Sequence, residues 1–207
     1  MLVAVLGGAA GNVAALDSAL AEIDDRGIHT VLCTGNLAVG DSDGNRVIER
    51  LRERRVTCVQ GEFDRFVVRA LRKADSLRKR LTEAAFEAIV CAHESLASEN
   101  VEYLRALPHR LTLSFEGKTI CLCHGSVTSQ GNALHADDSL EVFRRQREAA
   151  NCDVIVCGSD VEAFVREIDT TLFVNPGRVD AVMGRAAFAV IDTDGVPAIG
   201  ELVRVGC

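Results

Sequence analysis

Short apolar runs alternate with longer amphipathic stretches in the first third of the chain. The apolar runs are strand-sized, and Leu16, Leu20 and Ile23 recur about once per helical turn after the first of them. Strands separated by helices predict parallel pairing with right-handed crossovers. The predicted strands are residues 2–6, 30–33 and 56–59, and the predicted helices are residues 13–23 and 45–54.

The remainder of the chain is predicted to be helical first and then rich in strands. Residues 65–107 have a mostly helical pattern, with Ser98 as a cap for the last helix and Pro108 ending the run. Glu116 and Gly117 are typical of a hairpin turn. The further predicted strands are residues 110–115, 119–123, 154–157, 172–174, 186–192 and 199–205, and one more helix is predicted at residues 139–150.

Composition favours a folded protein. Hydrophobic residues make up 48% of the 207 residues and charged residues 26%, which argues against disorder. No apolar run is long enough to span a membrane, and no cationic segment precedes an apolar stretch at the start of the chain. With no internal linker or repeat, we expect one domain over residues 1–207 in a soluble cytoplasmic protein without an export signal.

The net charge is −7, so the protein has no overall attraction for the phosphate backbone of nucleic acid. One local exception is residues 69–80, which hold six Arg and Lys residues in a helical pattern. Asp75 and Glu83 interrupt or flank this run. A solvated helix face therefore explains it better than a phosphate-binding patch.

The eight cysteines do not have the spacing of a metal site. No Cys-x-x-Cys pair occurs, although a structural zinc site usually contains one. Most cysteines lie in apolar, strand-like segments, where they are expected to act as small buried hydrophobic residues. These are Cys33, Cys58, Cys121, Cys123 and Cys157, while Cys207 is expected to be an exposed thiol.

Glycine-containing loops follow several of the predicted strands. In α/β folds ligands bind at the carboxyl ends of strands, and glycine allows sharp turns and close approach of the backbone to a ligand. Each loop alone is a weak indication, but their shared position after strands makes a stronger one. The loops are residues 7–12, 35–36, 61–64, 124–125 and 158–161.

This ordered set of loops resembles the calcineurin-like metallophosphoesterases, in particular their small bacterial and archaeal phosphodiesterase branch. The resemblance covers residues 1–194 and implies an α/β fold (α+β in some schemes). That fold is a four-layer α/β/β/α arrangement: a β-sandwich flanked by helices, with loops from both sheets meeting at one dinuclear metal site. The supporting segments are residues 11–16, 32–36 and 102–108, with Cys123-His124-Gly125-Ser126 and Val174-Asn175-Pro176-Gly177.

The resemblance also implies that most metal ligands of the family are replaced in this chain. Its isolated His ligand is intact as His124, and its bridging Asp falls on Asn36. The other motifs have lost ligands or the catalytic His. The Asp-x-His motif reads Gly8-Ala9-Ala10, the Gly-Asn-His-Asp motif reads Gly61-Glu62-Phe63-Asp64, and the Gly-His-x-His motif reads Gly158-Ser159-Asp160-Val161.

Coordination chemistry makes a two-metal hydrolase an unfavourable interpretation. Two divalent ions about 3.5–4 Å apart need anionic oxygen between them. Asn36 is a neutral amide, and Gly8, Ala10 and Val161 offer no ligand atoms. Phe63 can neither donate a proton to a leaving group nor polarise a phosphate. We therefore expect no catalytic residues of the usual design.

A remnant of one metal position is conceivable. Asn36, Glu62 and His124, with Asp160 or Ser159 as a fourth group, could hold one Mn²⁺, Zn²⁺ or Mg²⁺ ion. We call Asn36, Glu62, His124 and Asp160 the vestigial metal site. The preferred interpretation is that no cofactor binds and that His124 is a buried remnant, hydrogen-bonded to neighbouring backbone, because Asn is a weak ligand.

Replacement ligands from the polar loop at residues 127–138 are conceivable but not favoured. His135, Asp137 and Asp138 lie in that loop, where such residues are common without binding a metal. His29, His93 and His109 lie in or beside predicted helices and strands, and surface roles are expected for them.

The residues at these motif positions are compatible with three functions. The first is a catalytically inactive binding or scaffold protein, with an unknown protein partner or a small phosphate or nucleotide ligand. Residues 32–37 and 61–64 are similar to the altered motifs of the retromer scaffold subunit, although residues 66–110 resemble the bacterial enzymes instead. The alternative is a phosphodiesterase or phosphatase with a single metal at Asn36, Glu62 and His124. The third is a sensor that binds a phosphate through the backbone near Gly7, Gly8 and Gly11.

Overall fold

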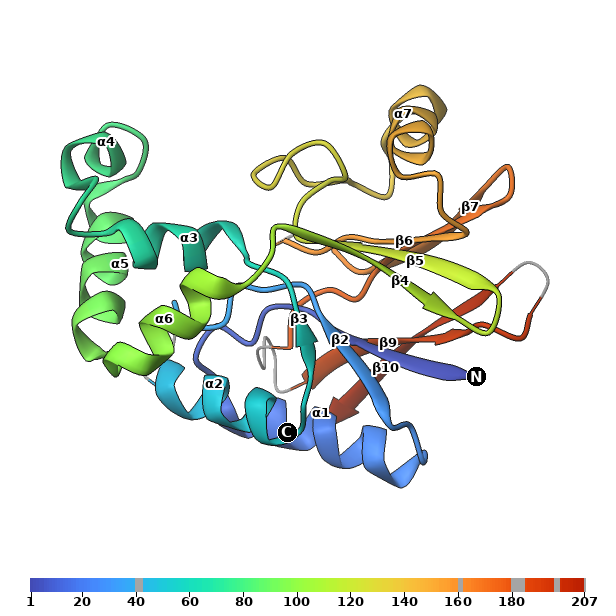
Figure 1. Cartoon of the computed structure of the whole chain (residues 1–207), viewed down its shortest axis with the longest axis horizontal. Helices are drawn as coiled ribbons and strands as arrows, with labels where there is room; N and C mark the ends of the chain where they lie inside the picture. The colour runs from blue at the N-terminus through green and yellow to red at the C-terminus, as the bar shows by residue number, and fades with distance from the viewer. Residues whose placement is uncertain (40–42, 160–161, 180–184, 196–197, 207) are drawn as a thin grey trace.

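Two five-stranded sheets pack face to face, and helices cover their outer surfaces (Figure 1). The computed structural model describes residues 1–39, 43–159, 162–179, 185–195 and 198–206. Apolar side chains from both sheets form the central layer of the core, with Val3, Val5 and Leu32 on one side and Leu122 and Val156 on the other. The four-layer α/β/β/α fold is thereby confirmed.

The first sheet has the strand order β10-β9-β1-β2-β3. Its three N-terminal strands run parallel, β9 pairs antiparallel with β1, and β10 pairs antiparallel with β9. The parallel half follows from the alternation of strands and helices, which places three consecutive loops at one edge of the sheet. The strands are β1 (Leu2–Leu6), β2 (Thr30–Cys33), β3 (Thr57–Cys58), β9 (Arg185–Asp192) and β10 (Ile199–Gly206).

The second sheet has the order β4-β5-β6-β8-β7. Its three central strands β5, β6 and β8 run parallel, and the two outer strands pair antiparallel to their neighbours. The parallel strands again bring their following loops to one edge. The strands are β4 (Arg110–Phe115), β5 (Lys118–Cys123), β6 (Val154–Val156), β7 (Phe164–Ile168) and β8 (Thr171–Asn175).

Most helices belong to the first sheet. Their buried apolar faces share one cluster with that sheet, and a separate cluster joins α7 to the second sheet through Phe143 and Phe173, whose ring centroids lie 4.9 Å apart. The helices are α1 (Val13–Asp25), α2 (Gly44–Glu53), α3 (Glu62–Arg69), α4 (Ala74–Arg78), α5 (Glu83–Ser95), α6 (Ser98–Ala106) and α7 (Leu140–Ala150).

The structure confirms the predicted strands and helices, with three corrections. Ser98 is the first residue of α6 and Ala97 is its cap, so the predicted cap was one position too late. Strand β7 was missed because Arg166 and Glu167 occupy its middle and leave little apolar signal. The run at residues 69–80 is not one helix, since α3 ends at Arg69 and α4 begins five residues later.

The predicted burial of the five strand-associated cysteines is confirmed. All five are less than 5% exposed, and no described cysteine forms a disulfide. Cys207 lies outside the described residues. Within the described part of the chain, no helix is both long and apolar enough to cross a membrane.

Candidate functional site

Loops from both sheets meet at the carboxyl edges of their parallel strands. The Nδ1 atom of His124, after β5, lies 2.6 Å from the carbonyl oxygen of Thr34, after β2. Gly158, after β6, donates its backbone N–H to the His124 carbonyl oxygen at 2.6 Å. Ala10, after β1, donates to the Asn36 carbonyl at 3.1 Å. The loops that the sequence singled out thus form one site.

Two glycines allow these loops to stack closely. A Cβ atom on Gly7 would lie 1.6 Å from the carbonyl oxygen of Gly177, which no side chain tolerates. Gly35 has φ +91°, and a Cβ atom there would lie 2.3 Å from the backbone nitrogen of Gly61. The backbone framework of the site is therefore retained and depends on glycine at both positions.

Asp64 fastens two of the loops together. Its Oδ2 atom accepts hydrogen bonds from the backbone N–H groups of Asn36 and Gly61, and its Oδ1 atom accepts one from Leu37, at 2.8–2.9 Å. The side chain is fully buried. Burial raises the pKa of Asp64, and the three amide donors together with nearby His124 partly offset this. Sequence analysis gave Asp64 no role; its position three residues after Gly61, at the start of α3, was the available signal.

The amide of Asn36 is already engaged by the protein. Its Oδ1 atom accepts a hydrogen bond from the backbone N–H of Phe63 at 2.9 Å, and the residue is 8% exposed. The backbone of Asn36 is left-handed, with φ +61°, a conformation that Asn tolerates better than most residues. The side-chain oxygen that would face a metal instead fixes the first turn of α3.

The carboxylate of Glu62 faces arginines. Its Oε1 atom lies 3.4 Å from Arg65 and 3.6 Å from Arg80. The same oxygen packs against Gly131, where an added Cβ atom would approach it to 2.6 Å. Neither arginine was predicted as part of the site. Arg65 lies one helical turn after Glu62, whereas Arg80 is 18 positions away in the chain and reaches Glu62 only through the turn after α3.

His124 stands where the resemblance places the family's isolated His ligand, and it is 3% exposed. The Thr34 carbonyl oxygen can only accept, so Nδ1 is the donor of this bond and Nε2 is the ring nitrogen left for another contact. This is the hydrogen bond to backbone that the sequence analysis expected. Metal-bound histidines are commonly oriented by the same kind of bond, and a buried histidine without metal needs it as well.

The fourth residue of the vestigial metal site, Asp160, lies outside the described residues, as does Val161. Its neighbour Ser159 is described; it has φ +89° and a buried hydroxyl oxygen without a hydrogen-bond partner. The Thr34 hydroxyl is buried and lacks a partner as well. His135, in the loop at residues 127–138, is exposed and donates its backbone N–H to Asp138.

These side chains do not fit a two-metal centre. Among the described residues, no group of three or more His, Cys, Asp and Glu side chains is placed to hold a metal ion. Asn36 is neutral and bonded to Phe63, and Glu62 pairs with arginines. The backbone amides of Ala10 and Gly11 donate to the carbonyls of Asn36 and Leu37, so these two do not face a ligand.

Residues 1–195 match the family described as the calcineurin-like phosphoesterase superfamily domain. A relative is the uncharacterized protein MJ0912 of Methanocaldococcus jannaschii, which is 25% identical over 125 residues. That alignment covers 60% of this chain and 49% of MJ0912, so the matched part spans about half of the relative's length.

Solved structures show the same fold. The hypothetical protein PH1004 of Pyrococcus horikoshii superposes with a TM-score of 0.83 at 20% identity, covering 99% of this chain and 88% of that one. Vacuolar Protein Sorting 29 of Cryptosporidium parvum superposes with a TM-score of 0.54 at 17% identity, covering 100% and 98%. The resemblance to both the prokaryotic branch and the retromer subunit is thus confirmed at the level of the fold.

Proposed function

The chain belongs to the calcineurin-like phosphoesterase superfamily, and we propose that it is a catalytically inactive binding protein built on that fold. The observation that carries the proposal is the hydrogen bond from Phe63 to the Oδ1 atom of Asn36. It joins the two residues that replace the bridging Asp and the catalytic His. Neither residue supplies what two-metal hydrolysis requires at its position: Asn36 has no carboxylate to bridge two metal ions, and Phe63 cannot donate a proton.

The backbone contacts of the site loops favour a binding function over an enzyme that has lost its activity without gaining another role. The close contact of Gly7 with Gly177 and the Asp64 clamp still hold the loops in place around the altered site. A protein that uses this edge of the sheets to bind a ligand or a partner needs the loops held in place but does not need metal ligands.

The proposal is tested by elemental analysis and turnover measured on the same preparation. We expect substoichiometric metal and no hydrolysis of bis-nitrophenyl phosphate after reconstitution with Mn²⁺, Zn²⁺, Mg²⁺ or Fe²⁺. His124→Ala serves to recognise a contaminating hydrolase, whose activity would not depend on His124. Saturable hydrolysis that this substitution abolishes would overturn the proposal.

A second candidate is a phosphoesterase with one metal ion at Asn36, Glu62, His124 and Asp160. The orientation of His124 favours it, because the Nδ1 bond to Thr34 leaves Nε2 as the ligand atom. Titration with Mn²⁺, followed by electron paramagnetic resonance, separates the two functions. One bound ion per chain that is lost in His124→Ala but kept in His29→Ala, a change at an exposed histidine, would support this candidate.

A further inference from the structure

Positive charge is concentrated beside the vestigial metal site. Residues 62–80 hold seven Arg and Lys and three Asp and Glu, a net charge of +4 in a chain whose total is −7. One of the three carboxylates, Asp64, is fully buried beneath backbone amides. The segment is therefore more basic toward solvent than its composition indicates.

The turn after α3 gathers this charge at one place. Because α3 ends at Arg69 and α4 is a separate short helix, the chain folds back and brings Arg80 to Glu62. Arg65 and Arg80 both lie on the ring of Phe66, with guanidinium carbons 5.5 and 5.4 Å from its centroid. A single continuous helix over residues 69–80 would have spread these cations along a solvated face.

Glu62 does not satisfy the two arginines. Both approach the same oxygen, at 3.4 and 3.6 Å, whereas a strong charge-assisted hydrogen bond is about 2.7–2.9 Å long. The Nε atom of Arg65 is buried without a hydrogen-bond partner. Burial lowers the pKa of Arg65; the nearby Glu62 carboxylate opposes this, and the positive charges of Arg69 and Arg80 add to the lowering. Two guanidinium groups therefore share one carboxylate oxygen, and the cluster keeps an excess of positive charge.

Other unpaired polar atoms surround the same region. Among the described residues, four buried side-chain atoms lack a hydrogen-bond partner, and all four belong to the site loops, to α3 or to the loop at residues 127–138. Gln130 donates its amide to the carbonyls of Gln60 and Gly61, next to Glu62, and leaves its Oε1 atom unpaired. Unsatisfied buried groups are few in folded proteins, so their concentration here indicates a ligand. The atoms are Arg65 Nε, Gln130 Oε1, Thr34 Oγ1 and Ser159 Oγ.

We propose that Arg65 and Arg80 bind the phosphate group of a small molecule at the rim of the vestigial metal site. Guanidinium groups present paired N–H donors that match phosphate oxygens, and here they replace the metal ions that this chain has lost the ligands to hold. The Oε1 atom of Gln130, whose amide bonds the backbone next to Glu62, supplies a hydrogen-bond acceptor for the rest of the molecule. The inference deepens the proposed function and rests on it.

The compactness of the cluster favours a small molecule over a polymer. The guanidinium groups of Arg65 and Arg80 converge on one carboxylate oxygen and one ring. Nucleic acid and extended acidic peptides need a basic strip, and the rest of this chain is acidic. The six Arg and Lys residues of 69–80 are exposed, which agrees with the predicted solvated face, and the proposal adds a binding role for Arg80 alone.

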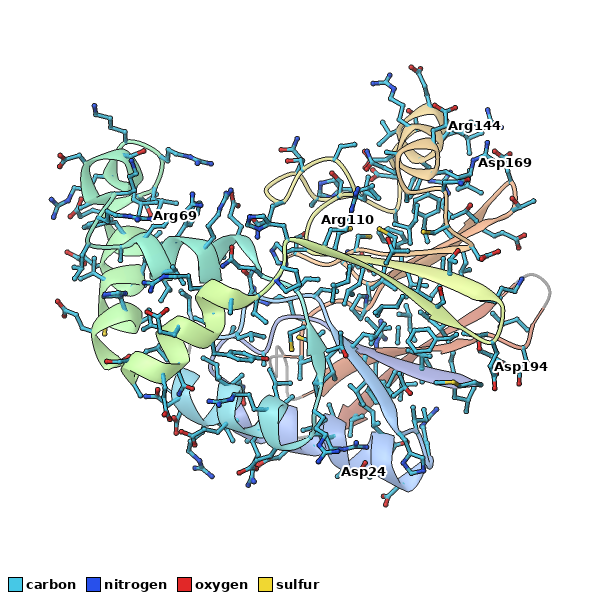
Figure 2. The ribbon with its side chains drawn as sticks, viewed as in Figure 1. Asp24, Arg69, Arg110, Arg144, Asp169 and Asp194 are labelled. Atoms are coloured by element: carbon cyan, nitrogen blue, oxygen red, sulfur yellow. The ribbon has the colours of Figure 1, made fainter. Side chains whose placement is uncertain are left out.

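The test is calorimetric titration of the protein with inorganic phosphate and with adenosine monophosphate at low ionic strength. We expect one saturable site per chain, and a loss of affinity of about tenfold in Arg65→Gln and in Arg80→Gln. Glu62→Gln removes the competing carboxylate and should tighten binding. Arg145→Gln is the matched control, because Arg145 is exposed on α7 and pairs with Glu141. Figure 2 shows its neighbour Arg144 on the opposite side of the view from Arg69.

The outcomes separate the ligand sources and the two proposals. Tighter binding of the monophosphate than of free phosphate identifies a phosphorylated organic molecule, and equal binding identifies the phosphate ion itself. No saturable binding, equal losses in Arg80→Gln and Arg145→Gln, or tighter binding of a hexaglutamate peptide overturns this inference but not the inactive binding function. Hydrolysis dependent on His124 would instead overturn the proposed function.

Discussion

The backbone N–H of Phe63 donates a hydrogen bond to the side-chain oxygen of Asn36 across 2.9 Å. The two residues stand where the family resemblance places a catalytic His and a bridging Asp. Their replacement is therefore more than a loss of two functional groups. The new pair forms a contact that stabilises the start of α3, which gives each substitution a structural role.

Restoring the bridging carboxylate should destabilise the protein. In Asn36→Asp, a buried charge would lie next to Asp64, whose carboxylate already binds the backbone N–H of residue 36. We expect a loss of about 2 kcal/mol of unfolding free energy at pH 7 and a smaller loss at pH 4, where the new carboxyl becomes protonated. Urea denaturation at both pH values measures this.

Asn132→Asp is the control for that substitution, because Asn132 is exposed. It should change stability little at either pH. Hydrolysis should not return in Asn36→Asp with added Mn²⁺, since Gly8, Ala10 and Phe63 remain. A variant as stable as the original protein would contradict the repulsion expected between a carboxylate at position 36 and Asp64.

Asp64→Asn should lower the free energy of unfolding substantially, although the two side chains have nearly the same shape. The Asp64 carboxylate receives three backbone N–H groups, and an amide offers one accepting oxygen in place of two. At least one buried donor loses its acceptor, which costs about 2–3 kcal/mol. Thermal or urea unfolding of Asp64→Asn measures the effect. Asp75→Asn is the control, because Asp75 is exposed in the first turn of α4. Equal stability of the two variants would argue against the clamp.

Gly35→Ala and Gly117→Ala separate backbone strain from steric collision. Both glycines are left-handed, with φ +91° and +85°, but an added Cβ atom meets the Gly61 nitrogen at 2.3 Å in the first and nothing within 4 Å in the second. Gly117→Ala should cost about 1 kcal/mol of unfolding free energy and Gly35→Ala several times more. Similar losses would show that the loops of the site can move apart.

Asp153 should contribute stability that disappears in acid. It accepts hydrogen bonds from the backbone N–H and the hydroxyl of Thr119, both at 2.8 Å. The backbone N–H of Thr119 is the main cause that lowers the pKa of Asp153 below its usual 3.8, with the Thr119 hydroxyl and Lys118 adding to it. The folded-state pKa is depressed, so the contribution is present above the unfolded pKa and is lost as pH falls through the folded one.

Unfolding of Asp153→Asn measures this contribution. We expect a deficit of about 0.5–1 kcal/mol at pH 7, kept small because the side chain is 39% exposed. The difference from the original protein should shrink below pH 4. Asp137→Asn, at an exposed position, should show neither effect. A deficit that stays constant down to pH 2 would contradict the assignment.

The amino-acid sequence by itself determined the alternation of strands and helices, and it determined which residues stand at the positions where the family resemblance places metal ligands. Apolar periodicity is a local property, so it predicted the parallel strands and the loops that follow them. The family resemblance, which is read from the sequence, places Asn36 at the bridging Asp and Phe63 at the catalytic His. Both conclusions need only residue identity and the order of the motifs.

Only the tertiary structure decided what the replaced residues contact. Phe63 meets Asn36 and Asp64 clamps Leu37 across 27 positions each, because two loops pack where parallel strands end. Arg80 reaches Glu62 because α3 stops at Arg69. Such contacts depend on how the chain turns back on itself, and short-range patterns do not encode the direction of that turn.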